Sequence, residues 1–323
     1  MGDMRLNKIK DILPEYGLGT AHVVQSGEKI AVATIEKAYE EGIRLFDTAP
    51  LYGTSGSNLG TGRSEAAVGQ ALSAVPRESY ILATKVGRRG ETIFDFTRDG
   101  ILASVEESLE RLKTDALDIL HIHDPDLANW PNPSSQTPIY RQVLDKVYPV
   151  VDELRSQGVV KAIGAGMNQW EMLDDFAKNG DFDCFLLAGR YTLLEQTSLD
   201  FLHNCLTRGI AVVLGGVFNS GILVRDLVPG VTYNYEAASQ ELLGRAHAIA
   251  SICQRHGISL PVAALRFVTM HPAVTSLVVG AENPSEVSQN LAMRSTKVPA
   301  QLWCDLKNEG LIEDNAPVDG NLC

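Results

Sequence analysis

The sequence lacks the features that mark membrane, secreted or metal-binding proteins. No apolar stretch is long enough to cross a bilayer, and residues 1 to 10 lack the apolar core of a secretory signal. The five cysteines are odd in number and scattered, so they form neither a disulfide framework nor a metal-ligand pattern. We therefore expect a cytoplasmic protein with reduced cysteines, no metal site and no membrane partner.

Acidic residues outnumber basic residues in this sequence. The chain has 28 Lys and Arg against 40 Asp and Glu, a formal net charge of −12, and its only dense basic cluster is Arg88 and Arg89. Such a surface repels phosphate backbones, so a nucleic-acid partner is not expected.

Two further absences bear on the fold. No Pro/Gly/Ser-rich or charge-biased linker divides the 323 residues, which predicts one domain over residues 1–323. No G-x-G-x-x-G follows the first apolar run, which argues against a doubly wound dinucleotide-binding sheet.

Short apolar runs alternate with segments of helical periodicity along the chain. The predicted strands are one ending near 17–20, then 43–47, 80–85, 117–123, 160–165, 183–188, 210–214 and 274–279. The predicted helices cover 29–41, 64–74, a stretch from 97, one ending over 150–158, then 199–208, 237–256 and 261–270. Eight strands alternating with helices predict an α/β protein with a single (β/α)8 TIM barrel.

Four ionisable residues lie at or just past the ends of three successive predicted strands: Asp47, Tyr52, Lys85 and His123. A parallel barrel gathers such residues at one mouth. Because a tyrosine hydroxyl ordinarily titrates near pH 10, acid or base work near neutrality needs a nearby cation, which Lys85 can supply. Asp47 would pair with Lys85 and keep it charged, and His123 would orient a substrate oxygen.

Each of these residues has a simpler interpretation when taken alone. Tyr52 can be an amphipathic surface residue, and Asp47 with Lys85 a structural ion pair. His121 faces the same side of its strand as His123, and we place His121 in the core because His123 stands at the strand end. Their joint occurrence at successive strand ends favours the functional interpretation.

The motifs carrying these residues resemble the aldo-keto reductase superfamily over about residues 17 to 291. They are GIRLFDTAPLYG at 42 to 53, Ser64-Glu65 with Gly69, Thr84-Lys85, and Leu117-Asp118 leading to Ile122-His123. The resemblance implies a (β/α)8 barrel that transfers hydride between a nicotinamide cofactor and a carbonyl or alcohol carbon. It also implies a catalytic tetrad of Asp47, Tyr52, Lys85 and His123.

The resemblance implies a cofactor site as well. Asn168 corresponds to the asparagine of a Ser-Asn pair that holds the carboxamide, while Met167 replaces the serine. Gly215-Gly216 stands where the family has a ring-stacking aromatic residue, and Phe218 comes slightly later. Residues 219 to 223 resemble the loop whose backbone amides contact the pyrophosphate. The cofactor-binding residues that we predict are Gly19, Thr20, Asp47, Asn168, Gly215, Asn219, Ser220, Gly221, Leu223, Gly280, Glu282, Glu286 and Asn290.

Two carboxylates bear on the choice of cofactor. Members that prefer NADP usually carry Lys or Arg where Glu282 stands, and often Arg where Glu286 stands, because a 2'-phosphate needs cationic partners. Carboxylates instead suit a free ribose hydroxyl, which predicts NAD, with NADP left open. The alternative is that Glu282 and Glu286 only open a solvated helix, where acidic residues favour the dipole.

The segments IHDPD at 122 to 126 and AGMNQWE at 165 to 171 resemble one branch of the family. It contains aldose 1-dehydrogenases, L-galactose and L-fucose dehydrogenases and pyridoxal 4-dehydrogenase. This implies NAD-dependent oxidation of a cyclic hemiacetal to a lactone, with a sugar-like or pyridoxal-like substrate at Tyr52, His123 and Asp124. Further candidates for substrate contact are Asn129, Trp130, Trp170 and residues 54 to 61.

Three other functions stay open. They are an NADPH-dependent carbonyl reductase of this fold, a cofactor-binding regulatory subunit, and an aldolase that uses Lys85 as a Schiff-base nucleophile. The sequence leaves the substrate and a homo-oligomeric state undecided, and residues 299 to 323 carry no recognisable motif.

Overall fold

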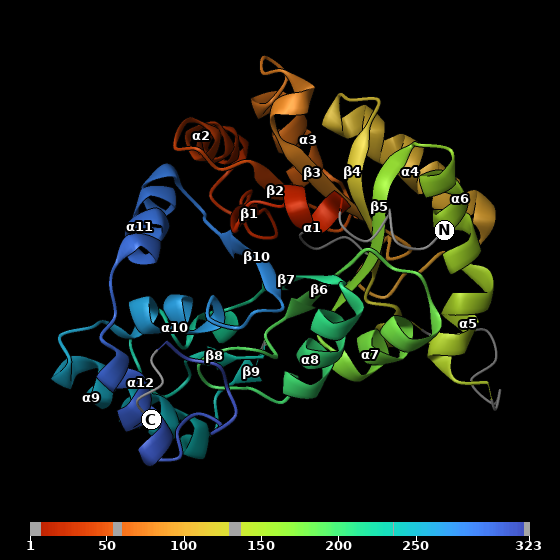
Figure 1. Cartoon of the computed structure of the whole chain (residues 1–323). Coiled ribbons are helices and arrows are strands. Elements are labelled where there is room, and N and C mark those ends of the chain that lie inside the picture. Colours follow the sequence, from red (N-terminus) through yellow and green to blue (C-terminus); the bar gives the residue numbers. More distant parts are fainter. Residues whose placement is uncertain (1–7, 54–59, 129–136, 235, 320–323) are drawn as a thin grey trace.

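The computed structural model describes residues 8–53, 60–128, 137–234 and 236–319. Eight parallel strands close into one barrel in the order β1, β10, β7, β6, β5, β4, β3, β2, with helices around the ring (Figure 1). Their bounds are Tyr16–Gly19 (β1), Leu45–Asp47 (β2), Ile81–Val86 (β3), Leu117–His123 (β4), Val160–Met167 (β5), Cys184–Ala188 (β6), Ala211–Gly215 (β7) and Val274–Gly280 (β10). The predicted (β/α)8 barrel is confirmed.

The helices include several that the sequence patterns did not reveal. They are Lys8–Ile12 (α1), Glu28–Glu40 (α2), Arg63–Ala71 (α3), Arg98–Leu112 (α4), Ile139–Lys146 (α5), Tyr148–Ser156 (α6), Trp170–Asn179 (α7), Leu199–Arg208 (α8), Gln240–Arg255 (α9), Leu260–Val268 (α10), Pro284–Ser295 (α11) and Ala300–Asn308 (α12). A hairpin of Thr232–Tyr233 (β8) and Glu236–Ala237 (β9) follows the seventh barrel strand.

Helix α4 shows how local sequence sets these bounds. The Thr97 side chain accepts a hydrogen bond from the Gly100 N–H, a cap that typically contributes about 1 kcal/mol. Ile101 and Val105 lie one turn apart and are buried, so one face of the helix packs on the barrel. Lys113, with a φ of 53°, then ends the helix in the left-handed conformation.

The helix predicted over 237–256 begins later than expected. Ala237 pairs with Thr232 in the β8–β9 hairpin. The Ser239 side chain accepts a hydrogen bond from the Leu242 N–H, so α9 begins at Gln240.

Two apolar clusters form the core. The larger one lies between the outer surface of the barrel and the helices. The smaller one fills the barrel interior, where Leu45, Ile119 and Val213 meet Ile9 and Leu13, which come from α1 and the residue just after it. Because Ile9 and Leu13 pack into the end of the barrel where the strands begin, we expect a ligand to enter at the opposite mouth.

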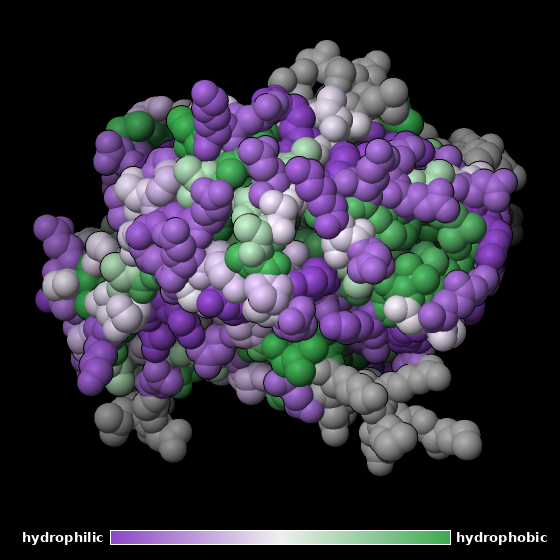
Figure 2. Space-filling view, turned by 90° about the horizontal axis from the view of Figure 1, so that it is seen from above, coloured by the Kyte–Doolittle hydropathy of each residue, from purple (hydrophilic) through white to green (hydrophobic). Residues whose placement is uncertain are grey.

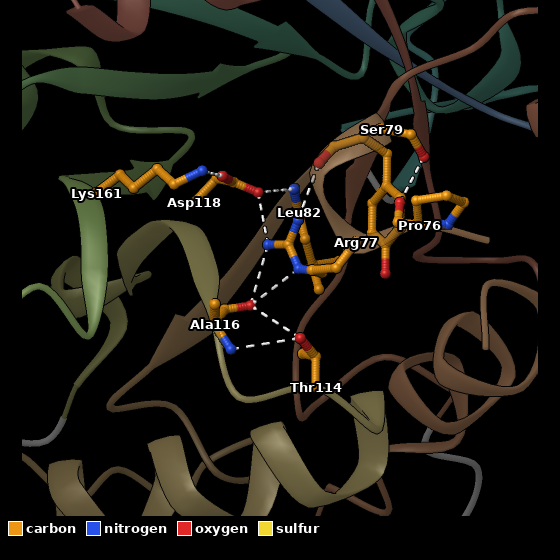
Figure 3. Close-up of polar contacts among 9 residues, drawn as sticks. Pro76, Arg77, Ser79, Leu82, Thr114, Ala116, Asp118 and Lys161 are labelled. Carbon is orange, nitrogen blue, oxygen red and sulfur yellow. Dashed lines mark hydrogen bonds and ion pairs between the residues drawn. The ribbon is translucent and has the colours of Figure 1, made fainter. Parts of the chain in front are cut away.

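An ionic network ties three strands together near their first residues (Figure 3). One oxygen of buried Asp118 accepts from the Leu82 N–H at 2.8 Å and from Arg77 at 2.6 Å, and Lys161 lies 2.7 Å from the other oxygen. A buried carboxylate needs such partners. The Leu117-Asp118 motif therefore joins β3, β4 and β5 and lies away from the mouth.

The surface and the cysteines complete the description. Hydrophilic residues cover most of the face in Figure 2, and apolar residues form separate patches on it. No helix among the described residues is long and apolar enough to span a membrane. Cys184, Cys205 and Cys253 are free thiols, whereas Cys304 is in a disulfide, so the expectation of reduced cysteines is wrong for Cys304.

Candidate active site

Lys85 and Asp47 form a buried ion pair at the mouth of the barrel. The Lys85 ammonium donates to both Asp47 carboxylate oxygens, at 2.8 and 2.7 Å, and to the Thr48 carbonyl at 2.8 Å. The two side chains are 1% and 5% exposed. All three N–H donors of the ammonium are therefore engaged, which argues against a free Schiff-base amine at this position.

Tyr52 and His123 complete the predicted tetrad. The Lys85 ammonium lies 4.7 Å from the centre of the Tyr52 ring, close enough for a cation–π contact. The Tyr52 and His123 rings meet edge to face, with centroids 5.8 Å apart. Asp47, Tyr52, Lys85 and His123 thus form one contiguous cluster, and their catalytic roles stay predictions.

The electrostatics of the cluster favour a neutral His123. Burial, with Lys85 and Arg88 nearby, holds the pKa of His123 well below its usual range, and burial with Lys85 does the same for His121. A neutral imidazole both donates and accepts a hydrogen bond. Burial raises the pKa of the Asp47 carboxyl, and the paired Lys85 opposes that rise.

His121 lies one layer deeper in the barrel than His123. It is directly opposite Lys85 in the β3–β4 register, and the backbone of Gly164 approaches its ring closely. A side chain at Gly164 would collide with that ring, since an added Cβ would lie 2.6 Å from the Nδ1 atom. The ring contact with Tyr52 is made by His123, the residue that we predicted to face the site.

Thr20, predicted to bind the cofactor, also positions Asp47. Its hydroxyl donates to the Asp47 carbonyl at 3.0 Å, and its backbone N–H donates to the same oxygen at 2.9 Å. The Ser64 hydroxyl donates in turn to the Thr20 carbonyl at 2.9 Å. The serine of the Ser64-Glu65 motif therefore holds the ends of β1 and β2 together beneath the ion pair.

Glu65 braces the neighbouring strand. Its fully buried carboxylate accepts from the Thr84 hydroxyl at 2.6 Å and from Arg111 at 2.7 Å. Gly69 lets α3 approach α4, because an added Cβ would lie 2.3 Å from the Arg111 carbonyl. Thr84, the residue before Lys85, is thus held in place by Glu65 of α3.

Asp124 has a partner that the sequence did not reveal. Arg88, which we interpreted only as part of a basic cluster, donates to Asp124 at 2.5 Å, and both side chains are largely buried. The same Asp124 oxygen lies 3.4 Å from the His123 Nε2 atom. Burial and the nearby Asp124 raise the pKa of Asp126 to about 6, and one Asp126 oxygen is buried without a hydrogen-bond partner. A charged cluster therefore adjoins the tetrad.

Small residues line the opposite side of the mouth. Gly19 pairs with Gly280, and Ala188 pairs with Gly215, so four neighbouring strands end in a glycine or an alanine. An added Cβ at Gly280 would have only the Gly19 carbonyl within 4 Å, at 3.8 Å. This strip of small residues brings Gly19, Gly215 and Gly280 together at neighbouring strand ends, and their contact with a cofactor stays a prediction.

Asparagines border this strip. The Asn168 side chain donates to the Ala188 carbonyl at 2.9 Å, and that of Asn290 donates to the Gly280 carbonyl at 3.1 Å. Asn219 begins a tight turn in which its φ and those of Ser220 and Gly221 are all positive. Leu223 is fully buried and its N–H donates to the Phe218 carbonyl at 3.2 Å, so nothing in the structure supports the predicted cofactor contact of this residue.

Glu282 and Glu286 lie where α11 begins. One Glu286 oxygen accepts from the Glu282 N–H at 2.9 Å and the other from the Asn283 side chain at 2.7 Å, while Asn283 caps the Glu286 N–H. Glu286 therefore takes part in a reciprocal cap, as the structural alternative for this residue anticipated. Glu282 precedes the helix, two residues after the Gly280 strand end.

Some predicted substrate contacts have no structural account. Asn129, Trp130 and residues 54 to 59 lie outside the described residues. Trp170 begins α7 and packs, partly buried, against the main core.

The barrel, with the buried Lys–Asp pair, the tyrosine and the histidine at one mouth, is the arrangement that the family resemblance implies for an oxidoreductase with a nicotinamide cofactor. The model of the Aldo/keto reductase family matches residues 15–308, and the chain belongs to that family. It is therefore an NAD(P)-dependent enzyme.

Several relatives are similar over most of their length. Pyridoxal 4-dehydrogenase from Microbacterium luteolum is 32% identical, with 92% of this chain and 94% of the relative covered. D-threo-aldose 1-dehydrogenase from a Pseudomonas species is 34% identical, covering 93% and 95%. L-galactose dehydrogenase from Arabidopsis thaliana is 32% identical, covering 82% and 78%. These relatives match the predicted branch.

The solved structures agree on the fold. An aldo-keto reductase from Bacillus halodurans, in its holo form, superimposes with a TM-score of 0.74 at 23% identity and covers 94% of each chain. A glycerol dehydrogenase from Gluconobacter oxydans gives 0.69 at 22% identity, with 96% of this chain and 95% of the other covered.

Proposed function

We propose that the protein is an NAD-dependent dehydrogenase that oxidises a cyclic hemiacetal, at an aldose C1 or in pyridoxal, to a lactone. The observation that carries the proposal is the tetrad cluster in a chain 32 to 34% identical to pyridoxal 4-dehydrogenase and D-threo-aldose 1-dehydrogenase. The names of these two relatives give dehydrogenation at position 4 of pyridoxal and at position 1 of an aldose.

Tyr52 is the base of this reaction. The adjacent Lys85 ammonium stabilises the Tyr52 phenolate. The phenolate takes the proton of the anomeric hydroxyl, and the oxygen of that hydroxyl becomes the carbonyl oxygen of the lactone. A nicotinamide bound beside the tetrad would supply the acceptor for the hydride that leaves the carbon bearing this hydroxyl. Asp47 keeps Lys85 charged, because its carboxylate receives two of the three ammonium hydrogen bonds.

His123 and Asp124 orient the substrate. Neutral His123 donates to the reacting oxygen, and no deprotonation of the imidazole is needed, since its pKa is already held low by burial. The Arg88–Asp124 pair lies beside it and offers both a donor and an acceptor to the hydroxyls next to the reacting carbon. A polar, multiply hydroxylated substrate suits this surface better than a simple alcohol.

NAD is the proposed cofactor because of the charges at the start of α11. Glu282 and Glu286 bring carboxylates to the segment that follows the Gly280 strand end. A carboxylate repels a 2'-phosphate and accepts hydrogen bonds from a free ribose hydroxyl. The capping role of Glu286 leaves Glu282 as the residue on which this preference mainly depends.

An oxidation screen tests the proposal. Purified protein is incubated with NAD or NADP over a panel of aldoses, pyridoxal and simple alcohols, and the reduced cofactor is followed by absorbance. We expect turnover with NAD and a hemiacetal substrate, and mass spectrometry should detect the lactone. Turnover confined to NADPH-dependent carbonyl reduction, or cofactor binding with no turnover in either direction, would contradict it.

A further inference from the structure

The Asn219 side chain has a buried acceptor that none of the described residues uses. Its Nδ2 atom donates to the Gly189 carbonyl at 3.1 Å, whereas its Oδ1 atom is buried without a hydrogen-bond partner. Reversing the amide would place two acceptors against each other, so this contact fixes which atom is the oxygen. Asn219 is 2% exposed. A buried acceptor of this kind calls for a donor from a ligand or from water.

The position of Asn219 indicates which part of the cofactor would supply the donor. Its amide binds the Gly189 carbonyl, and the amide of Asn168 binds the carbonyl of the preceding residue, Ala188. The two asparagines, from the ends of β5 and β7, therefore hold consecutive carbonyls at the end of β6. An added Cβ at Gly189 would lie 3.7 Å from both Nδ2 atoms, so the two amides flank the same point of the backbone.

The strand that lies between these amides offers no polar side chain of its own. β6 ends at Ala188 and is followed by Gly189, whose φ is 69°. Gly216 after β7 approaches it so closely that an added Cβ would lie 3.2 Å from the Gly189 N atom. Side-chain amides at this rim therefore come from the neighbouring segments: from Asn168, from Asn219, and from Asn234, whose oxygen already accepts from Arg190.

We propose that Asn219 binds the carboxamide of the nicotinamide ring, with its Oδ1 atom accepting from the carboxamide NH₂ group. This places Asn219 at the nicotinamide end of the cofactor, beside Asn168, instead of at the pyrophosphate, the role that the family resemblance suggested. The inference rests on the family's use of a nicotinamide cofactor and is independent of the substrate and of the choice between NAD and NADP.

Binding measurements without any substrate test the proposal. Isothermal titration compares NAD with ADP-ribose, which keeps the pyrophosphate and both riboses and lacks the nicotinamide. If the protein prefers NADP, NADP and 2'-phospho-ADP-ribose take their place. For Asn219→Gly, we expect the Kd of the dinucleotide to rise by about tenfold, while the Kd of ADP-ribose stays within about twofold. Glycine is chosen because Asn219 has a φ of 46°.

Asn234→Gly is the matched control. Asn234 also has a positive φ, 47°, and also lies near Gly189, but its Oδ1 atom already accepts from Arg190 at 2.8 Å. Its substitution should leave the ratio of the two Kd values unchanged. A third ligand, the 3-acetylpyridine analogue of NAD, has no NH₂ group, so wild type and Asn219→Gly should bind it with similar affinity.

Each contrary result has a distinct meaning. If Asn219→Gly weakened the binding of NAD and of ADP-ribose equally, Asn219 would act at the pyrophosphate or on the structure of the loop. That result would overturn the proposal. Unchanged binding of both ligands would show that only water uses the Oδ1 atom, and would overturn it as well. A variant that fails to fold, judged by its circular dichroism, is replaced by Asn219→Asp, which keeps an acceptor at this position. That variant should bind NAD better than ADP-ribose, and loss of this preference would count against the carboxamide role.

Discussion

The two sides of the barrel mouth differ in how their polar groups are partnered. On the side of β2, β3 and β4, the cations are held by contacts within the protein: Lys85 donates to three acceptors, and Arg88 donates to Asp124. On the side of β6, β7 and β10, the strands end in small residues and Asn219 keeps an unused acceptor.

We interpret this difference as one between groups that are fixed before the reaction and groups that are left open to bind a ligand. Groups that must hold a charge during a reaction are best fixed before the substrate arrives, because they then need no rearrangement at that moment. A surface that must receive a cofactor has to leave space and unused hydrogen-bonding capacity. Substitutions on the first side should therefore affect turnover and stability, and those on the second side should affect cofactor binding.

The largest expected effect is on turnover, from Tyr52→Phe. Removing the hydroxyl leaves no base for the substrate proton, so we expect kcat to fall by about 10³-fold or more. The ring that packs on His123 is retained, and the Kd for the cofactor should stay within about twofold. Steady-state kinetics and titration measure the two quantities. Activity near that of the wild type would remove Tyr52 from the mechanism.

Lys85→Met should lower the stability of the fold. It leaves the buried Asp47 carboxylate without its cation, and breaking a buried pair in this way typically costs about 3–5 kcal/mol. Denaturant unfolding measures the loss. The double variant Asp47→Asn with Lys85→Met removes both charges and should recover part of the free energy of unfolding. A double variant no more stable than Lys85→Met would show that the unpaired charge is not the cause.

Gly280→Val probes the opposite side of the mouth and should have the smallest effect. The added side chain enters open space above the strand ends, so the free energy of unfolding should change by less than about 0.5 kcal/mol. The same side chain occupies the strip proposed for the cofactor, and the Kd for NAD should rise by about tenfold, or about 1.4 kcal/mol. Gly280→Ala should have a weaker effect in the same direction. NAD binding unaffected by valine would place the cofactor elsewhere.

Much of the barrel was predictable because its signals are local. All eight barrel strands lie within two residues of the predicted ranges, since each one is a short apolar run bounded by turn residues or helix caps. The hairpin at Thr232–Tyr233 and Glu236–Ala237 was missed, because two residues per strand carry no periodicity. The short α1 was missed for the same reason, and its role in closing the barrel depends on residues far away in the chain.

Some residues of the candidate site could likewise be predicted from the sequence, and others could not. Asp47, Tyr52, Lys85 and His123 could be named from the sequence, because strand ends in a parallel barrel converge whatever the details of packing. Arg88 could not be assigned from the sequence, because its partner Asp124 lies 36 positions away and no motif links the two residues. A charged residue three positions after a predicted catalytic lysine was the only available signal.

The sequence by itself determined the order of strands and helices, and with it the family and the four residues at the mouth, because these follow from local periodicity and from motifs in fixed order. Only the tertiary structure decided how the other polar groups are partnered: Glu286 caps a helix, Asp118 joins strands near their first residues, and Asn219 keeps an acceptor that no described residue uses. The physical reason is that hydrogen bonding of a buried group depends on every segment packed around it, and the chain brings those segments together only when it folds.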